Sequence, residues 1–298
     1  MSLVQNMRVL IRKNLWLRKL IAFRLVPTGL FDSWIMNKEL SDIWQERLKI
    51  TVSSPDNDFI PRVKNAGEVL QGKQIMHNGL KINLGSYYGP EVARVLKANR
   101  GVHEPQEERI FGEILKKLPK NAVMLELGAF WGFYSMWFQK EIPGAVNHLI
   151  EPDPFNRVSG QLNFRLNGMS GKFYPYFIGK EQAGSKGTIS INTFFEQQNL
   201  KTVHILHSDI QGYELEMLEG ADYALKNVWF VFISTHSNEL HHRCEELLVG
   251  QGFKLLTSID KDDSFSEDGL IVAQHPEIHL MEKIELSRRT GHSKSTNN

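Results

Sequence analysis

Apolar residues in the second half of the chain form short runs of strand length, separated by stretches with the apolar spacing of helices. Five runs have the length of buried strands. They are Val123–Leu127, Val146–Glu151, Lys172–Ile178, Val203–Asp209 and Val228–Thr235. Two more, Phe253–Ile259 and Leu270–Ala273, are predicted to close the sheet as an antiparallel pair. Strands that alternate with helices are typical of an α/β protein with a mainly parallel sheet.

The first hundred residues lack this alternation. Residues 1–30 contain six basic residues and no acidic one, and on a helix their apolar side chains share one face. We expect this helix to dock on its own domain or on a second subunit. The alternative is a helix on an anionic membrane face, where each basic side chain contributes about 1 kcal/mol. Residues 31–100 are predicted to be an accessory region, with a helix over Phe31–Ile50 and a hairpin over Ile75–Leu84.

Composition narrows the class of protein. The apolar fraction of 41% and the charged fraction of 23% are those of a soluble protein with a sizeable core. A formal net charge of +1 argues against nucleic acid as the main partner. Cys244 is the only cysteine, which excludes an intrachain disulfide and fits a reducing compartment such as the cytoplasm.

No targeting or membrane segment is evident. The longest apolar runs are shorter than the ~20 residues of a membrane-spanning helix, and the start of the chain lacks the pattern of a signal peptide. We therefore predict a main domain at residues 101–286 and a disordered, Ser-, Thr-, Lys- and Asn-rich tail at 287–298.

The junction after the first strand carries two glycines. Residues 123–132 read V-M-L-E-L-G-A-F-W-G, with three residues between Gly128 and Gly132. Glycines at such a turn let the backbone approach a ligand and leave the amides of the new helix pointing at it, although they also occur for packing alone. Glu126 is predicted to accept hydrogen bonds from that ligand. The fingerprint G-x-G-x-x-G is absent, which argues against a nicotinamide dehydrogenase.

Acidic residues end three of the predicted strands. They are Glu126 on the first, Glu151 on the second and Asp209 on the fourth. Ligands of open α/β sheets bind beyond the carboxyl ends of the strands, and an acid one helix and one strand after a glycine loop can meet both hydroxyls of a ribose. The three acids and the glycine loop together predict a nucleoside-type ligand.

Four motifs extend this pattern. They are E-L-G-A-F-W-G at 126–132, E-P-D-P-F-N at 151–156, N-F-R-L-N-G at 163–168 and D-I-Q-G-Y-E-L-E-M-L-E-G-A at 209–221. With them, the chain from about Gly101 to Ala273 resembles methyltransferases of the FkbM type. The resemblance implies a Rossmann-like class I methyltransferase fold with a seven-stranded sheet. It also implies S-adenosylmethionine as methyl donor and a hydroxyl acceptor on a sugar, glycolipid or natural product.

The resemblance assigns the cofactor to residues near the first three strand ends. They are Glu126, Gly128, Ala129, Phe130, Gly132, Tyr134, Glu151, Pro152, Ile178 and Gly179. The chain departs from the family pattern at Gln211, where an acid is usual, and at His207, where a lysine is usual. Lys180 stands where an acid would recognise the adenine, so recognition of the adenine amino group has no candidate.

A histidine follows the fifth strand on the same sheet edge as Asp209. Removal of a proton from a hydroxyl acceptor suits a neutral histidine near its ordinary pKa of ~6.5. We predict His236 as general base, with Asp209 orienting it or the acceptor hydroxyl. The alternative is that His236 packs or caps the helix before Asn238.

Two further groups of residues are weaker candidates. A metal held by Asp209, His236, His241 and His242 is not favoured, because adjacent histidines point about 100° apart on a helix, and no metal is predicted. His103, Glu104, Glu107 and Glu108 are expected either at the mouth of the site or as first-turn acids of a helix over Gln106–Leu118.

Rival functions share the same fold. The acceptor can be a nitrogen or a carboxylate, and a carboxylate needs no base. A scaffold protein without turnover is the rival from another class. Partners are predicted to be a small-molecule or glycan acceptor, with specificity in residues 30–110 and 180–200.

Overall fold

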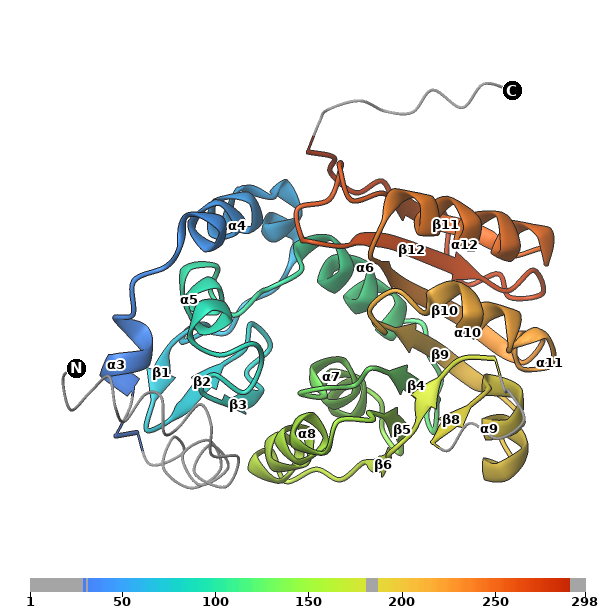
Figure 1. The fold of residues 1–298 in the computed structure, drawn as a ribbon, viewed down its shortest axis with the longest axis horizontal. Coiled ribbons are helices and arrows are strands. Elements are labelled where there is room, and N and C mark those ends of the chain that lie inside the picture. The colour runs from blue at the N-terminus through green and yellow to red at the C-terminus, as the bar shows by residue number, and fades with distance from the viewer. Residues whose placement is uncertain (1–28, 31, 181–186, 290–298) are drawn as a thin grey trace.

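The computed structural model describes residues 29–30, 32–180 and 187–289, and a seven-stranded sheet forms its centre (Figure 1). The strands are β4 (Val123–Leu127), β5 (Val146–Ile150), β6 (Lys172–Tyr174), β9 (Val203–Ser208), β10 (Val228–Thr235), β11 (Lys254–Ile259) and β12 (Gly269–Gln274). Their order is β11-β12-β10-β9-β4-β5-β6. Strand β12 runs antiparallel to both neighbours, and the other adjacent pairs are parallel. The predicted Rossmann-like sheet is confirmed.

Helices cover both faces of this sheet (Figure 1). One face carries α6 (Pro105–Leu115), α7 (Phe133–Glu141) and α8 (Pro154–Leu166), and the other carries α9 (Ile191–Gln198), α10 (Glu214–Glu219), α11 (Asp222–Leu225) and α12 (Asn238–Gly250). Because successive side chains of a strand point to opposite faces, Met124 packs in the first core and Leu125 in the second. The strand ends that carry the candidate site therefore stand on a rigid, doubly covered sheet.

The third predicted strand, Lys172–Ile178, is wrong in its second half. Strand β6 ends at Tyr174, and β7 (Phe177–Ile178) pairs with β8 (Thr188–Ile189) in a separate two-stranded sheet. Pro175 stands between β6 and β7, and proline has no N–H to donate to a strand ladder. Ile178 therefore belongs to the small sheet, and Gly179 follows it directly.

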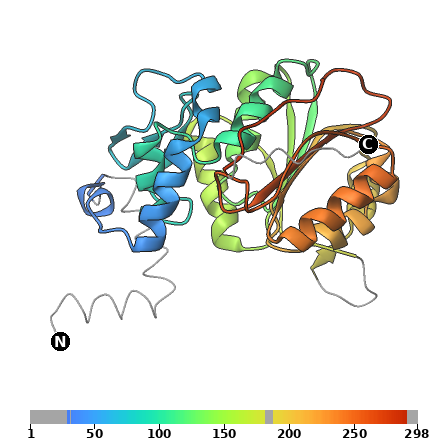
Figure 2. The ribbon, with the colours of Figure 1, turned by 90° about the horizontal axis from the view of Figure 1, so that it is seen from above.

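The accessory region lies beside the sheet domain (Figure 2). It contains α3 (Asp32–Met36), α4 (Asp42–Ser53), the 3₁₀ helix η3 (Pro55–Phe59), the antiparallel strands β1 (Val69–Leu70), β2 (Lys73–Ile75) and β3 (Lys81–Asn83), and α5 (Pro90–Ala98). The predicted single helix to Ile50 is two helices, because Ser41 is extended and starts a new helix that has Asp42 in its first turn. Strands β2 and β3 flank Gly79, whose φ is 87°.

Asn163 of α8 and Asn167, the C-cap of that helix, join this region to the sheet domain. The side-chain oxygens of Asn163 and Asn167 accept hydrogen bonds from the amides of Asn83 and Lys81, each at 2.9 Å. The Asn167 amide donates back to the Lys81 carbonyl at 2.7 Å. The asparagines of the motif N-F-R-L-N-G thus bond to the free backbone edge of β3, where a fourth strand would otherwise pair. These bonds hold the accessory sheet against α8.

Several expectations fall outside the described residues. The basic segment 1–30 is described only at its last two positions, and the tail 287–298 only at 287–289. The domain boundaries remain a prediction. No helix in the described part of the chain is long and apolar enough to cross a membrane.

Candidate active site

The turn between β4 and α7 is held by backbone contacts on two sides. Gly128, Phe130 and Gly132 have φ values of 71°, 36° and 71°. A Cβ on Gly128 would overlap the carbonyl oxygen of Asp209, and one on Gly132 would lie 2.8 Å from the ring of Phe164. Both glycines thus serve close packing, and the β9 strand end lies directly against the turn. The amides of Gly128 and Ala129 donate to the Ile150 carbonyl.

Glu151 follows β5 and binds the turn from the other side. One carboxylate oxygen accepts from the Phe130 amide at 3.0 Å and the other from the Asp153 amide at 2.8 Å. The residue is only 4% exposed, and burial raises the pKa of its carboxyl. The Asn156 side chain also donates to this carboxylate, which keeps acceptor capacity for one further donor. The residue that the sequence assigns to a ribose is therefore in contact with the predicted glycine turn.

A cleft of about 340 Å³ opens at the same edge of the sheet. The accessory region contributes the aromatic side chains of Trp44, Tyr87 and Tyr88, and Tyr87 also stacks on Trp131 of the glycine turn. The sheet domain contributes a polar wall of Glu104, Asp209, Gln211, His236, Lys261 and Asp268. Two predicted catalytic residues and three aromatic rings thus meet in one cavity.

His236 is surrounded by carboxylates. Its Nδ1 lies 2.8 Å from Glu214 Oε1, and its Nε2 lies 3.3 Å from Asp209 and 3.6 Å from Asp268. Burial alone would lower the pKa of the imidazole, but Asp209 and Glu214, with Asp268, raise it to about 10. The ring is therefore a cation at neutral pH, which does not fit the neutral imidazole that the predicted general base requires. The imidazole instead holds the carboxylates of Asp209, Glu214 and Asp268 close together.

Asp268 is a site residue that the sequence prediction missed. It lies in the cleft directly before β12, and burial raises the pKa of its carboxyl to about 6 while the His236 cation opposes this shift. Because β12 is antiparallel, its first residue Gly269 pairs with Thr235 at the end of β10. An acid directly before an antiparallel strand that closes the sheet lies at the same edge as the acids that follow the parallel strands. This position could have been found in the sequence.

None of the ten predicted cofactor residues lines the cleft, and two of them, Glu126 and Tyr134, are directed to buried partners. Glu126 accepts a hydrogen bond from the Ser135 amide at 3.3 Å, and burial raises its carboxyl pKa to about 7. The Tyr134 hydroxyl donates to Glu104 at 2.8 Å. Both residues are about 4% exposed, and Tyr134 packs in the first core. Both side chains thus have hydrogen-bond partners inside the protein. Another predicted cofactor residue, Pro152, directly follows Glu151 and is partly exposed.

The residues before α6 form a buried network of ionisable groups. His103 lies 2.6 Å from Glu108 and 2.9 Å from Glu104. Burial opposes the charge of His103, but the two glutamates raise its pKa to about 10. His103 and Glu104 also line the cleft. The expectation that they stand at the mouth of the site therefore matches their position, while Glu107 and Glu108 lie deeper.

The departures from the family pattern have local partners. His207 Nε2 lies 2.5 Å from Glu107 Oε1, so the histidine in the lysine position pairs with a glutamate of α6. Gln211 has a φ of 58° and donates to Asp209 Oδ1 at 3.0 Å. Within the described residues, no group of three or more His, Cys, Asp or Glu side chains could hold a metal ion.

A family model matches part of the chain that builds this edge. The model described as "Methyltransferase FkbM domain" matches residues 184–255, which contain β9, β10 and α9 to α12. The resemblance to FkbM methyltransferases is confirmed over this segment. No curated protein matches the sequence.

Three solved structures are similar to part of the chain. Precorrin-6y C5,15-methyltransferase from Geobacter metallireducens is 14% identical, with 56% of this chain and 87% of that chain covered and a TM-score of 0.40. TrmK of M. capricolum, in complex with S-adenosyl-homocysteine, is 11% identical, with 55% and 67% covered and a TM-score of 0.39. Ribosomal protein L11 methylase from Lactobacillus delbrueckii subsp. bulgaricus is 11% identical, with 59% and 81% covered and a TM-score of 0.39.

Proposed function

We propose that the protein is an S-adenosylmethionine-dependent methyltransferase that methylates a hydroxyl group of a sugar, glycolipid or natural product. The observation that carries the proposal is the contact among three strand ends. The glycine turn after β4 binds Glu151 after β5 through the Phe130 amide, and it packs against Asp209 after β9. Asp209 in turn faces the cleft. These contacts support adjoining places for a nucleoside-type donor and an acceptor on one edge of the sheet.

The residues around the turn fit this donor. The buried Glu151 carboxylate accepts from two backbone amides and from the Asn156 side chain, and it keeps acceptor capacity for a ribose hydroxyl. The bound donor supplies an electrophilic methyl group on a sulfonium. The turn and Glu151 position that group, and Asp209, with the His236 cation behind it, orients the acceptor.

The cleft favours a neutral, hydroxyl-bearing acceptor. Tyr87, Tyr88 and Trp44 offer apolar faces, and the carboxylates of Asp209 and Asp268 accept hydrogen bonds from hydroxyls. A carboxylate acceptor would not need a base. The cationic His236 cannot serve as one, and this observation favours the carboxylate. However, basic groups also line the cleft, among them Arg47, Lys261 and the His236 cation, so the charge of the cleft does not choose between the two acceptors. The aromatic faces beside hydrogen-bond acceptors support the hydroxyl acceptor.

The acceptor proton needs a base other than His236. We assign this role to Asp268, because it lines the cleft and its raised pKa of about 6 leaves it ionised at neutral pH but close to the working range of a base. As the acceptor oxygen attacks the methyl carbon in line, the carbon–sulfur bond breaks with its electron pair on sulfur. The hydroxyl proton passes to an Asp268 carboxylate oxygen.

Transfer of a radiolabelled methyl group to a panel of neutral sugars, acidic sugars and amines tests this proposal. We expect label on a neutral hydroxyl acceptor, in a methyl ether that survives mild alkali. Label that mild alkali releases as methanol would indicate a carboxylate acceptor, and label on an amine would indicate nitrogen. Binding of S-adenosylhomocysteine without transfer to any acceptor class would favour the scaffold hypothesis.

We further propose that the protein acts in the cytoplasm, with residues 1–30 as its contact with a membrane, a second subunit or its own domain. The single cysteine and the charge pattern of that segment support this placement. A glycolipid acceptor would be reached most directly if that segment contacts a membrane.

A further inference from the structure

Tyr88 lies in the loop between β3 and α5 with its backbone in the left-handed region. Its φ is 45°, and two glycines of the same loop, Gly85 and Gly89, have φ values of 70° and 81°. This conformation suits glycine but is rare for an aromatic residue, and such strained positions cluster at functional sites. The residue is 49% exposed, so burial in the core does not explain its conformation. The loop therefore holds an aromatic ring at the surface of the cleft, against the preference of its backbone.

Aromatic contacts fix the position of this ring. The centroid of the Tyr88 ring lies 4.6 Å from that of Tyr87 and 5.1 Å from that of Phe130, with interplanar angles of 60° and 73°. Tyr87 is itself stacked on Trp131 at 4.4 Å. Phe130 belongs to the glycine turn, and its amide donates to Glu151. Tyr88 thus stands at the border between the turn assigned to the methyl donor and the cleft assigned to the acceptor.

Two carboxylates of the cleft are neighbours of the same side chain. Burial, followed by the charges of Asp209 and Asp268, raises the pKa of the Tyr88 hydroxyl to about 12. The side chain is therefore uncharged at neutral pH. All three residues line one cleft of about 340 Å³, which is the size of a site for a single small molecule. A molecule that packs on Tyr88 in this cleft has the two acids beside it.

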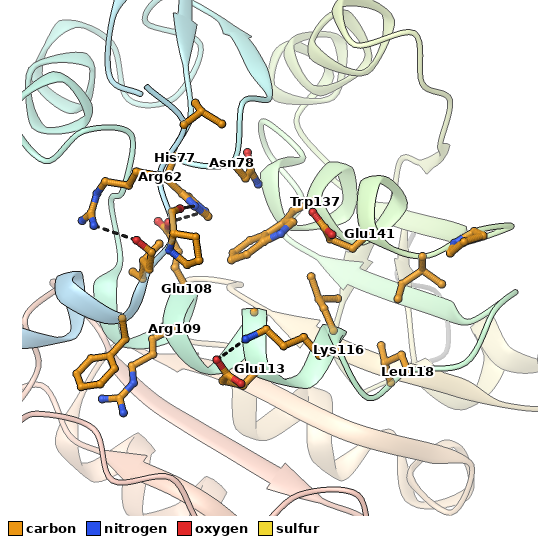
Figure 3. A pocket seen from close by; sticks show the side chains of 18 of the residues that line it. Arg62, His77, Asn78, Glu108, Arg109, Glu113, Lys116, Leu118, Trp137 and Glu141 are labelled. Carbon is orange, nitrogen blue, oxygen red and sulfur yellow. Dashed lines mark hydrogen bonds and ion pairs between the residues drawn. The ribbon is translucent and has the colours of Figure 1, made fainter. Parts of the chain in front are cut away.

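A larger cavity, of about 600 Å³, lies along α6 and lacks this combination. Figure 3 shows the side chains that line it, where Lys116 pairs with Glu113 at 2.7 Å. Neither Asp209 nor Asp268 is among its lining residues. A hydroxyl group held there would not meet the acids at the strand ends, so the place for the acceptor is the cleft.

A pyranose ring matches the surroundings of Tyr88. One face of such a ring carries C–H groups, which pack on an aromatic side chain, and its hydroxyl groups lie around its edge, where they donate to carboxylates. A linear polyol has the same hydroxyl groups but no rigid C–H face. The ring of the acceptor, and not its hydroxyl groups alone, is therefore what an exposed tyrosine beside two acids can recognise.

We propose that Tyr88 determines the specificity for the acceptor, because its ring is the platform on which the C–H face of a neutral pyranose packs, so that a hydroxyl group of the sugar faces Asp209 and Asp268. This inference rests on the proposed function and names the acceptor of the same site. It concerns the binding of the sugar, which can be measured without methyl transfer.

Saturation-transfer NMR with three probes, the methyl pyranosides of glucose, galactose and mannose, tests this contact in the presence of S-adenosylhomocysteine. We expect at least one pyranoside to bind the wild type, with more saturation from the aromatic side chains on the hydrogens of one ring face than on those of the other. Glucitol, the linear polyol, should bind at least about tenfold more weakly.

Two substitutions at Tyr88 separate the ring from its hydroxyl and its backbone. Tyr88→Asn removes the ring but suits the left-handed backbone, and it should weaken binding of the pyranoside at least about tenfold. Tyr88→Phe restores the ring and should bind within about threefold of the wild type. The matched control is Tyr223→Asn, because Tyr223 on α11 is also 49% exposed and does not line the cleft. Titration with S-adenosylhomocysteine on each variant should give affinities within about twofold of the wild type.

Equal binding of the pyranoside by the wild type and Tyr88→Asn would overturn the proposal, and so would glucitol that binds as tightly as the pyranosides. Loss of S-adenosylhomocysteine binding in Tyr88→Asn would place the role of Tyr88 in the glycine turn and would also overturn it. If no pyranoside binds the wild type, the proposal fails, and methyl transfer to another class of acceptor then shows that the proposed function stands without it. Failure of the wild type to bind S-adenosylhomocysteine is, by contrast, a failure of the proposed function itself.

Discussion

Replacing Asp268 with asparagine should lower kcat for the hydroxyl acceptor by about 10²–10⁴-fold, the usual contribution of a general base. Asparagine keeps the shape of the side chain but cannot take the acceptor proton. Asp268 does not touch Glu151 or the glycine turn, so the affinity for S-adenosylhomocysteine should change less than about twofold. The measurement is steady-state methyl transfer, with calorimetric titration of S-adenosylhomocysteine on the same preparation.

The pH profile makes this prediction specific. A base must be ionised to act, so activity of the wild type should fall as the pH drops through about 6, the raised pKa of Asp268. This acidic limb should vanish from the residual activity of Asp268→Asn. Asp262→Asn is the matched control, because Asp262 is exposed on the same loop and contacts Asn238. Full activity of Asp268→Asn would remove Asp268 from the mechanism.

Replacing Gly128 with alanine should destabilise the protein by more than about 4 kcal/mol, a loss seen only for a specific steric or polar defect. The new Cβ would overlap the Asp209 carbonyl oxygen and lie 2.9 Å from its carbonyl carbon, so the β4 and β9 strand ends must separate. The left-handed φ of 71° adds a further 1–2 kcal/mol. Each kcal/mol of lost stability lowers the unfolding temperature by roughly 2–4 °C, so the midpoint of thermal unfolding should fall by about 10 °C or more.

Gly168→Ala is the control for the backbone conformation alone. Gly168 has a φ of 68°, and a Cβ there would meet nothing within 4 Å. Its cost should be only the 1–2 kcal/mol of the left-handed conformation. Equal shifts of the unfolding temperature for Gly128→Ala and Gly168→Ala would contradict this account. They would show that the close packing against Asp209 is not the reason for a glycine at position 128.

The sheet could be predicted from sequence because its signal is local. Runs such as Val123–Leu127 and Val228–Thr235 are apolar over a full strand length, and both strands form with those bounds. The broken third strand shows the limit of this signal. Tyr174 and Ile178 belong to one apolar run, but Pro175 between them cannot donate to the ladder, and the chain turns to pair with β8.

The candidate site could be predicted only in part. The strand-end acids Glu151 and Asp209 follow from strand positions, and both lie at the expected edge. The charge of His236 does not follow, because it depends on Glu214 and Asp268, which reach the imidazole from α10 and from the loop before β12. The aromatic wall of the cleft depends on how the accessory region docks, and no periodic pattern in the sequence encodes that docking.

The central claim is that the β4 turn and Glu151 hold S-adenosylmethionine, and calorimetric titration with S-adenosylhomocysteine tests it most directly. The wild type should bind with a micromolar dissociation constant. Glu151→Ala should weaken binding by at least about tenfold, because a hydrogen bond to a charged group contributes about 1.5–3 kcal/mol. Glu246→Ala, an exposed residue of α12, is the control and should bind like the wild type. No binding to the folded wild type would contradict the claim, and unchanged binding to Glu151→Ala would contradict the ribose contact.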